Sequence, residues 1–115
     1  MRYLCLIYDD EKLVEGMSKE EGEVFMGEYF AFTDGIRASG QYVAGEALQP
    51  VATATTVRMR NGKLSTTDGP FAETKEQLGG FYLLDCTDAE ALEYAGKLPA
   101  AETGSVEVRA AGVAH

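Results

Sequence analysis

The first apolar run of this chain, residues 3–8, carries no charged residue at any position. A half-buried strand would alternate apolar and polar side chains, so this run predicts a strand buried on both faces. Residues 80–86 show equally little alternation and predict a second strand of the same kind. A sheet built around these two strands would need cover on both of its faces.

Two stretches carry apolar residues at helical spacing, and each opens with a residue placed to cap a helix. Ser18 precedes Glu21, and Thr87 precedes Glu90, by the three-residue spacing of a capping box. Gly40 and Pro99 are the corresponding stop signals. The predicted helices cover about 18–39 and 87–98, with apolar sides formed by Phe25, Tyr29, Phe32 and Ile36 and by Ala91, Leu92, Ala95 and Leu98.

Shorter strands account for most of the remaining chain. Residues 53–60 are rich in β-branched side chains and alternate, and Asn61-Gly62 after them is a strong hairpin signal, which makes 63–67 the return strand. Further strands are expected at 42–48 and 105–109, and irregular connections at 9–17 and 100–104.

Strands and helices in this order, within 115 residues, predict an α+β fold: a ferredoxin-like sandwich in one domain spanning residues 1–115. Two helices can cover one face of the sheet. Because two strands look apolar on both faces, the economical cover for the second face is the same face of another copy. We therefore expect a homodimer.

Composition narrows the class of protein. Acidic residues outnumber basic ones by 19 to 10, which argues against a general nucleic-acid surface. No run approaches the roughly 20 apolar residues of a membrane span, and no signal peptide is recognisable, so we expect a cytoplasmic protein. Cys5 and Cys86 lie in apolar runs and are expected to be buried free thiols, too few and too isolated for a metal site. We expect neither metal nor cofactor.

The densest group of reactive side chains lies in residues 68–77, between two predicted strands. Asp-Gly-Pro at 68–70 is a turn signal, and about one helical turn is expected over 72–77. Phe71 is expected to be a largely buried anchor. Loops that gather acid, base and hydroxyl groups commonly carry function.

This loop also carries a resemblance. The nine residues Asp-Gly-Pro-Phe-Ala-Glu-Thr-Lys-Glu at 68–76 resemble the signature of the DGPF family, within the broader YCII-related proteins. The resemblance implies a dimeric α+β barrel, in which two sheets face each other with the helices outside. Genes for relatives often lie beside those for extracytoplasmic-function sigma factors, which implies a regulatory link. Further matching segments are 2–8, 54–58, 77–82 and 104–109.

Asp68 is the first candidate for chemistry, as a general acid or base. The alternative is a turn carboxylate that bonds its own backbone. Lys75 could bind an anionic group of a substrate, or it could be a surface lysine beside Glu73 and Glu76. Glu73 could be a second carboxylate near Asp68, or a residue favoured at a helix start by the helix dipole.

Arg58 and Arg60 sit two residues apart on a predicted strand, so they point to the same face. They would bind an anion if that face lines a cavity, and otherwise form a solvated strand face. Tyr8, Tyr29 and Tyr82 could place hydroxyls in a pocket, or could simply pack in the core.

His115 is the only histidine and is expected at a solvent-exposed end. Broader YCII-related proteins are proposed to use a histidine–aspartate pair whose histidine lies well inside the chain. This sequence has no internal histidine, so that pair is not carried over. The same absence argues against haem held through histidine.

Two functions remain open. The first is an enzyme acting on a small anionic metabolite, with Asp68 as acid or base and Arg58 or Lys75 as the binding group. The second is a non-catalytic protein that binds a ligand or a regulatory partner. An Asp68 shielded in a closed cavity would favour the enzyme, and an exposed Asp68 would favour the second function.

Overall fold

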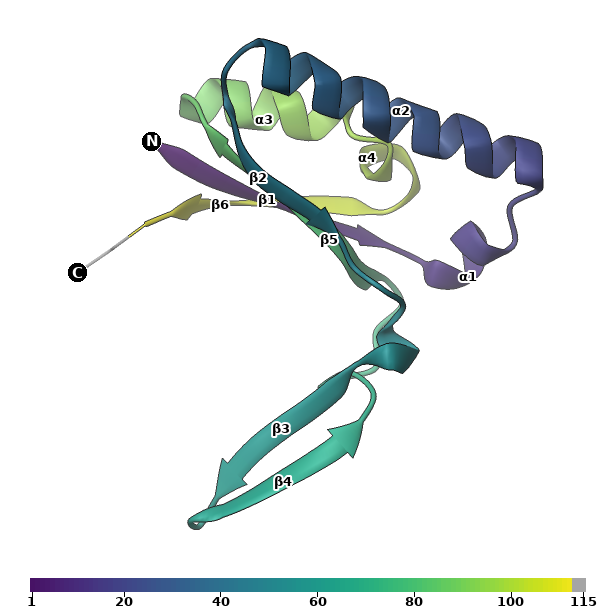
Figure 1. Ribbon diagram of the computed structural model, residues 1–115, viewed down its shortest axis with the longest axis vertical. Coiled ribbons are helices and arrows are strands. Elements are labelled where there is room, and N and C mark those ends of the chain that lie inside the picture. Colours follow the sequence, from purple (N-terminus) through teal and green to yellow (C-terminus); the bar gives the residue numbers. More distant parts are fainter. Residues whose placement is uncertain (113–115) are drawn as a thin grey trace.

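A four-stranded antiparallel sheet forms the centre of the fold in the computed structural model, which describes residues 1–112 (Figure 1). The strand order is β2-β5-β1-β6, and both long helices lie on one face of the sheet. This arrangement confirms the expected ferredoxin-like α+β fold. His115 lies outside the described residues. The strands of the sheet are β1 (Arg2–Asp9), β2 (Tyr42–Ala47), β5 (Gln77–Asp85) and β6 (Ser105–Ala111).

The two long helices are α2 (Lys19–Ala38) and α3 (Asp88–Lys97), and both predicted capping boxes are present. Ser18 and Glu21 exchange side-chain and backbone hydrogen bonds, as do Thr87 and Glu90. Gly40 follows α2 with a φ of 80°, the left-handed conformation that glycine adopts without strain. No helix of the described chain is long and apolar enough to cross a membrane.

Two short helices occupy connections that the sequence predicted to be irregular. The first, α1 (Glu11–Glu15), is capped by the Asp10 carboxylate, which accepts a hydrogen bond from the Lys12 backbone N–H at 2.9 Å. The second, α4 (Ala100–Thr103), begins directly after Pro99. A proline is favoured at a helix start, so the residue taken as a stop for one helix also opens the next.

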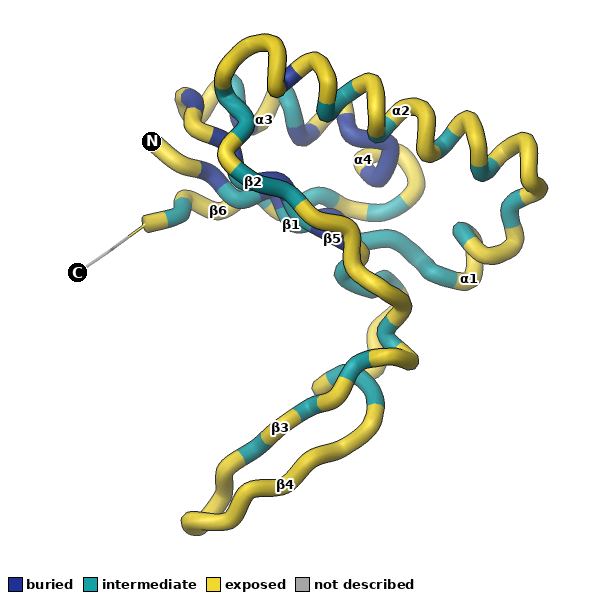
Figure 2. The backbone as a smooth tube through the Cα atoms, viewed as in Figure 1, coloured by how far each residue is buried: buried dark blue, intermediate teal, exposed yellow. Residues whose placement is uncertain are grey.

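The core lies between the sheet and the helices (Figure 2). On β1 the buried residues alternate with half-buried ones: Tyr3, Cys5 and Ile7 face the helices, whereas Leu4 and Leu6 lie on the opposite face. The expectation that this strand is buried on both faces is therefore not met within one chain, because no layer formed by residues 1–112 covers the second face. The expectation of two buried free thiols is confirmed for both cysteines.

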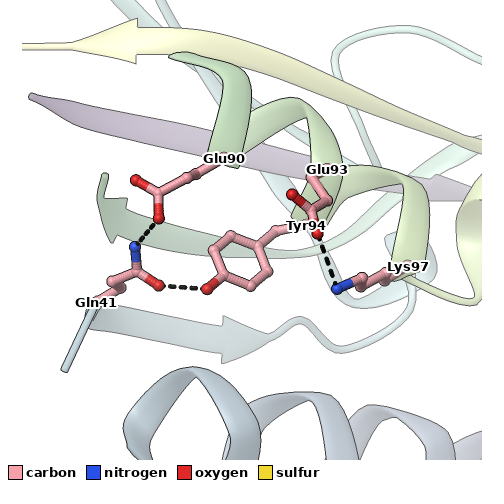
Figure 3. A network of polar contacts seen from close by, with 5 residues as sticks. All are labelled: Gln41, Glu90, Glu93, Tyr94 and Lys97. Atoms are coloured by element: carbon pink, nitrogen blue, oxygen red, sulfur yellow. Dashed lines mark hydrogen bonds and ion pairs between the residues drawn. The ribbon is translucent and has the colours of Figure 1, made fainter. Parts of the chain in front are cut away.

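A polar network joins the start of β2 to α3 (Figure 3). The side-chain amide of Gln41 donates through its nitrogen to Glu90 at 2.6 Å, and its oxygen, Oε1, accepts a hydrogen bond from the Tyr94 hydroxyl. Hydrogen bonds from the Thr87 backbone and from Gln41 hold the pKa of Glu90 below its ordinary value. Glu90 thus caps its own helix and also anchors the chain that leaves α2.

The segment between β2 and β5 leaves the body altogether (Figures 1 and 2). After a short 3₁₀ turn, η1 (Val51–Thr53), the strands β3 (Thr55–Arg60) and β4 (Lys63–Asp68) form a separate two-stranded sheet. We call residues 55–68 the hairpin arm. Its Asn61-Gly62 turn has positive φ at both residues, 52° and 75°, as the sequence signal predicts.

Residues 69–76, which we call the signature loop, contain no helical turn, so the expectation for 72–77 is wrong. The strand β5 starts at Gln77 and includes both following glycines. A Cβ at Gly80 would lie 2.8 Å from the Glu46 carbonyl oxygen, so this glycine permits close approach of β2 instead of breaking the structure. Phe71 is 80% exposed, which overturns the prediction of a buried anchor. Leu92, expected on the buried side of α3, is exposed as well.

Candidate functional site

A groove of about 600 Å³ lies between α2 and the strands β2 and β5. We call it the helix–sheet groove. Its walls are mostly apolar, with a small number of polar groups between them, which is the usual character of a small-molecule site. Aromatic residues of its lining include Phe25, Tyr29, Phe30, Tyr42 and Tyr82.

The helical repeat of α2 places the side chains of one wall of the groove in a row. Phe25, Tyr29, Thr33 and Arg37 recur every four residues along α2, and all four line the groove. On the opposite wall a glycine makes room for the rings. A Cβ at Gly45 would lie 3.0 Å from the ring of Tyr82, so a larger residue would push this ring out of place.

Two hydroxyl groups meet inside the groove. The Thr33 and Tyr82 hydroxyl oxygens are 2.6 Å apart, and the Thr33 hydroxyl also donates to the Tyr29 carbonyl oxygen at 2.9 Å. A threonine hydroxyl has one hydrogen, so the Tyr82 hydroxyl is the donor in the shorter contact. The oxygen of Tyr82 consequently keeps lone pairs for a further donor.

Burial raises the pKa of two tyrosines that line the groove, Tyr29 and Tyr82. It raises the pKa of Tyr29 to about 12, with a smaller contribution from the negative charge of Asp9. Burial also raises the pKa of Tyr82. These residues can therefore offer a hydroxyl to a ligand, but they do not supply a phenolate base near pH 7.

Arg37 is the basic residue of the groove lining. Its guanidinium carbon lies 4.7 Å from the centroid of the Tyr42 ring, so the planar group is held against an aromatic face. It forms no ion pair with any acidic residue of the described chain. A guanidinium held in this way can still donate two parallel hydrogen bonds to a carboxylate.

Two acidic residues at the other end of the groove have structural partners. The Glu11 carboxylate accepts from the Val51 backbone N–H at 2.9 Å. One oxygen of Asp9 accepts from the Thr103 hydroxyl at 2.9 Å, whereas its other oxygen is buried without a partner. These contacts tie α1 and β1 to the segments around them. Among residues 1–112, no group of three or more histidines, cysteines and carboxylates is placed to hold a metal ion.

A second hollow, of about 650 Å³, lies beside the signature loop. Tyr8, predicted from the sequence as a binding residue, lines it together with Pro70 and Phe71. Arg58, another predicted binding residue, places a guanidinium nitrogen 3.4 Å from the Phe71 carbonyl oxygen. The Thr56 hydroxyl donates to the Gly69 carbonyl oxygen at 2.8 Å and fastens the loop to the hairpin arm.

The three charged residues predicted in or next to the signature loop are exposed in the single chain. Asp68, Glu73 and Lys75 line neither the helix–sheet groove nor the second hollow. The structure thus brings Tyr8 and Arg58 to the loop but leaves these charges facing solvent.

Sequence reasoning missed Thr33 and Arg37. The signal was present, because both residues continue the four-residue repeat that begins at Phe25 and Tyr29. Polar residues on an apolar helical stripe point toward the space between the helix and its support, and that is where a groove can form.

Comparison with known proteins shows which family and which relative this chain is similar to. A sequence model of the YCII-related domain matches residues 1–111. An uncharacterized protein of Rhizobium meliloti (strain 1021) is 44% identical over 112 residues, which cover 95% of this chain and 90% of that protein.

Proposed function

This chain belongs to the YCII-related family, and from that premise we propose that it binds a small organic molecule in the helix–sheet groove. The observation that carries the proposal is the unpaired Arg37 at a largely apolar, aromatic groove. In an apolar cleft, a small number of convergent polar groups orients the ligand, while the apolar walls provide most of the affinity.

The ligand class is an apolar or aromatic body with one anionic group. Arg37 binds the anion, and the Tyr82 oxygen accepts a hydrogen bond from the body of the ligand. The exposed carboxylates of Glu15, Asp34 and Glu46 along the lining disfavour a ligand with several negative charges. An anionic metabolite is thus accommodated, with Arg37 in the binding role that the sequence suggested for Arg58 or Lys75.

Binding without catalysis is the better supported of the two functions. Burial raises the pKa of Tyr29 and Tyr82, so neither supplies a base near pH 7, and Asp68 is exposed and outside the groove. A carboxylate that acts as a general acid or base near pH 7 needs shielding or a charged neighbour. Among residues 1–112 of a single chain, none gives Asp68 that shielding.

An enzyme using Asp68 is the second candidate. It is supported by the contact of Arg58 with the signature loop and by Tyr8 in the adjoining hollow. Glu73 and Lys75 would then bind substrate beside Asp68. Residues 68–76 further support placing the chain in the DGPF branch of the family. This candidate requires a second surface that covers Asp68.

A thermal-shift comparison of three probes with one common body tests the proposed ligand class. The probes are 3-phenylpropionate, 3-phenylpropanol and 3-phenylpropylamine, which share a phenylethyl body and end in an anionic, a neutral and a cationic group respectively. We expect the carboxylate to raise the melting temperature most, because a ligand that binds only the native state stabilises it. A preference for the amine would contradict the anionic class.

Two matched arginine variants test the place of binding. Arg37→Gln should remove the advantage of the carboxylate over the alcohol, whereas Arg60→Gln, on the exposed hairpin arm, should leave it unchanged. Equal losses in the two variants would show that general charge, and not the groove, governs the effect.

A further inference from the structure

The helix–sheet groove and the second hollow meet at the end of β2. Leu48, Pro50 and Gln77 line both of them. Figure 1 shows β2 leading from the end of α2 to the base of the hairpin arm, so the groove and the second hollow follow each other along this path. At their junction Leu48 is 46% exposed, and Pro50 is exposed as well. The surface that joins the groove to the second hollow is therefore largely apolar and accessible.

The polar side chain at this junction already has its partners. The side-chain nitrogen of Gln77 donates to the Thr74 carbonyl oxygen, and its side-chain oxygen accepts from the Glu11 backbone N–H at 2.9 Å. A polar group is costly to cover only when it loses its hydrogen bonds. A hydrocarbon chain can thus cross the junction without taking a hydrogen bond away from Gln77.

The groove and the second hollow differ in charge. Arg37 lines the groove, and its guanidinium forms no ion pair with an acidic residue of the described chain. Among the described residues that line the second hollow, only Glu76 is charged, and its carboxylate accepts from the Ser105 hydroxyl at 2.8 Å. The anionic end of a ligand is therefore favoured in the groove, and the second hollow suits an uncharged, apolar end.

The length of β2 sets the length of a ligand that reaches both. The Arg37 guanidinium lies against the ring of Tyr42, which is the first residue of this strand. The six residues of β2 span about 20 Å at a rise of about 3.3 Å per residue. A ligand with its anionic group at Arg37 enters the second hollow only if its apolar part extends beyond this strand.

We propose that the helix–sheet groove and the second hollow form one binding site for a long-chain monocarboxylate. Arg37 binds the carboxylate, the aromatic walls of the groove enclose the middle of the chain, and the second hollow takes the end of the chain beside Phe71. The exposed ring of Phe71 then covers the hydrocarbon. This inference rests on the function proposed above and specifies the apolar part of its ligand. A free carboxylate is a better match than a lipid in an anionic membrane, because the formal charge of −9 opposes approach to such a surface.

Calorimetric titration with octanoate and with stearate tests the length of the ligand. Octanoate is shorter than the groove, whereas stearate is long enough to pass the junction. We expect stearate to bind at least about tenfold more tightly, because more methylene groups leave water. The methyl ester of stearic acid lacks the charge, and we expect it to bind at least about tenfold more weakly than stearate.

Two matched alanine variants test where the end of the chain lies. Ala54→Trp places a large ring in the second hollow, whereas Ala52→Trp adds the same ring at an exposed position that lines neither the groove nor the hollow. We expect Ala54→Trp to reduce the advantage of stearate over octanoate to below about threefold, with the affinity for octanoate unchanged. Ala52→Trp should keep the full advantage. Equal advantages in the two variants would overturn the proposal.

The outcomes separate this inference from the function on which it rests. If 3-phenylpropionate binds in a manner that depends on Arg37 but stearate gains nothing over octanoate, only the second hollow is removed from the site. If 3-phenylpropionate and stearate bind Arg37→Gln as tightly as the unaltered chain, or do not bind at all, both proposals fail.

A measurement on the unaltered chain keeps the test decisive if Ala54→Trp disturbs folding. A nitroxide group attached to stearate broadens the NMR signals of protein groups close to it. We expect a nitroxide near the methyl end to broaden the backbone amide signals of Ala54 and Phe71, and one near the carboxyl end to broaden those of Arg37 and Tyr42. Broadening of the same residues by both labels would overturn the proposal. So would broadening by the methyl-end label that is confined to α2 and β2.

Discussion

The body and the hairpin arm use the same strand chemistry in opposite surroundings. Leu84 in β5 is fully buried, whereas Leu64 in β4 is 64% exposed, although both are leucines in regular strands. The difference arises from the layers around each strand: helices pack on one face of β5, whereas all six residues of β4 are exposed in the described part of the chain. Local pattern thus determines that a strand forms, and the surrounding layers determine whether it is buried.

The largest expected effect uses these two leucines directly. Leu84→Ala should lower the free energy of unfolding by about 2–5 kcal/mol, because it removes buried methyl groups and leaves a cavity. Leu64→Ala should change the stability of the isolated chain by less than about 0.5 kcal/mol. Urea denaturation at two protein concentrations measures both.

Measurements at several protein concentrations sharpen the comparison between Leu84→Ala and Leu64→Ala. The effect of Leu84→Ala should not depend on protein concentration, whereas any effect of Leu64→Ala should grow as association increases. A large loss for Leu64→Ala at every concentration would show that the arm packs on its own body in solution.

Much of the body could be predicted from the sequence because its signals are local. The capping boxes at Ser18 and Thr87 located both long helices, and the Asn61-Gly62 turn located the hairpin. The exposure of Phe71 could not be predicted, because it depends on whether a distant layer reaches the loop. An apolar residue beside a turn looks the same in either case.

The candidate site was harder to predict than the fold. The sequence left two roles open for Tyr29 and Tyr82, hydroxyls in a pocket or rings in the core; both line the helix–sheet groove, and both also belong to or pack against the core. The repeat from Phe25 places Arg37 on the groove side of α2, but the contact of its guanidinium with the Tyr42 ring depends on how the following strand packs and could not be predicted from that repeat. The roles of Asp68, Glu73 and Lys75 remain proposals, since in the single chain each faces solvent.

A smaller effect should appear in the pH dependence of the body. Burial, with a lesser contribution from Cys86, raises the pKa of the Cys5 thiol from 9.0 to about 11. The unfolded chain therefore loses this proton at lower pH than the folded chain does, and stability should fall as pH rises from about 9 to about 11. A shift of this size corresponds to about 2–3 kcal/mol.

Urea denaturation at successive pH values, on the unaltered chain and on Cys5→Ala, checks this expectation. The difference between the two profiles isolates the thiol, because the raised pKa of Tyr29 contributes equally to both. Leu64→Ala, a change in the arm, should follow the unaltered profile. Parallel profiles for the unaltered chain and Cys5→Ala between pH 9 and pH 11 would contradict a buried, protonated Cys5.

The smallest expected effect is that of Phe71→Ala in the signature loop. A ring buried as an anchor would cost about 3–5 kcal/mol when removed, but Phe71 is 80% exposed, so we expect a loss below about 0.5 kcal/mol. Phe32→Ala is the matched control in the body, because this ring packs edge-on against Tyr82, with ring centroids 5.1 Å apart. Its removal should cost several times more than removal of Phe71.

If Phe71→Ala loses more stability than expected, the dependence of that loss on protein concentration distinguishes two explanations. A loss above about 2 kcal/mol for Phe71→Ala at all concentrations would place the ring in the core of its own chain. A loss that appears only where chains associate would place Phe71 in a contact between copies. In that case the signature loop would be anchored as the sequence suggests, but by the partner copy, and the arm and body would differ in which chain supplies their cover.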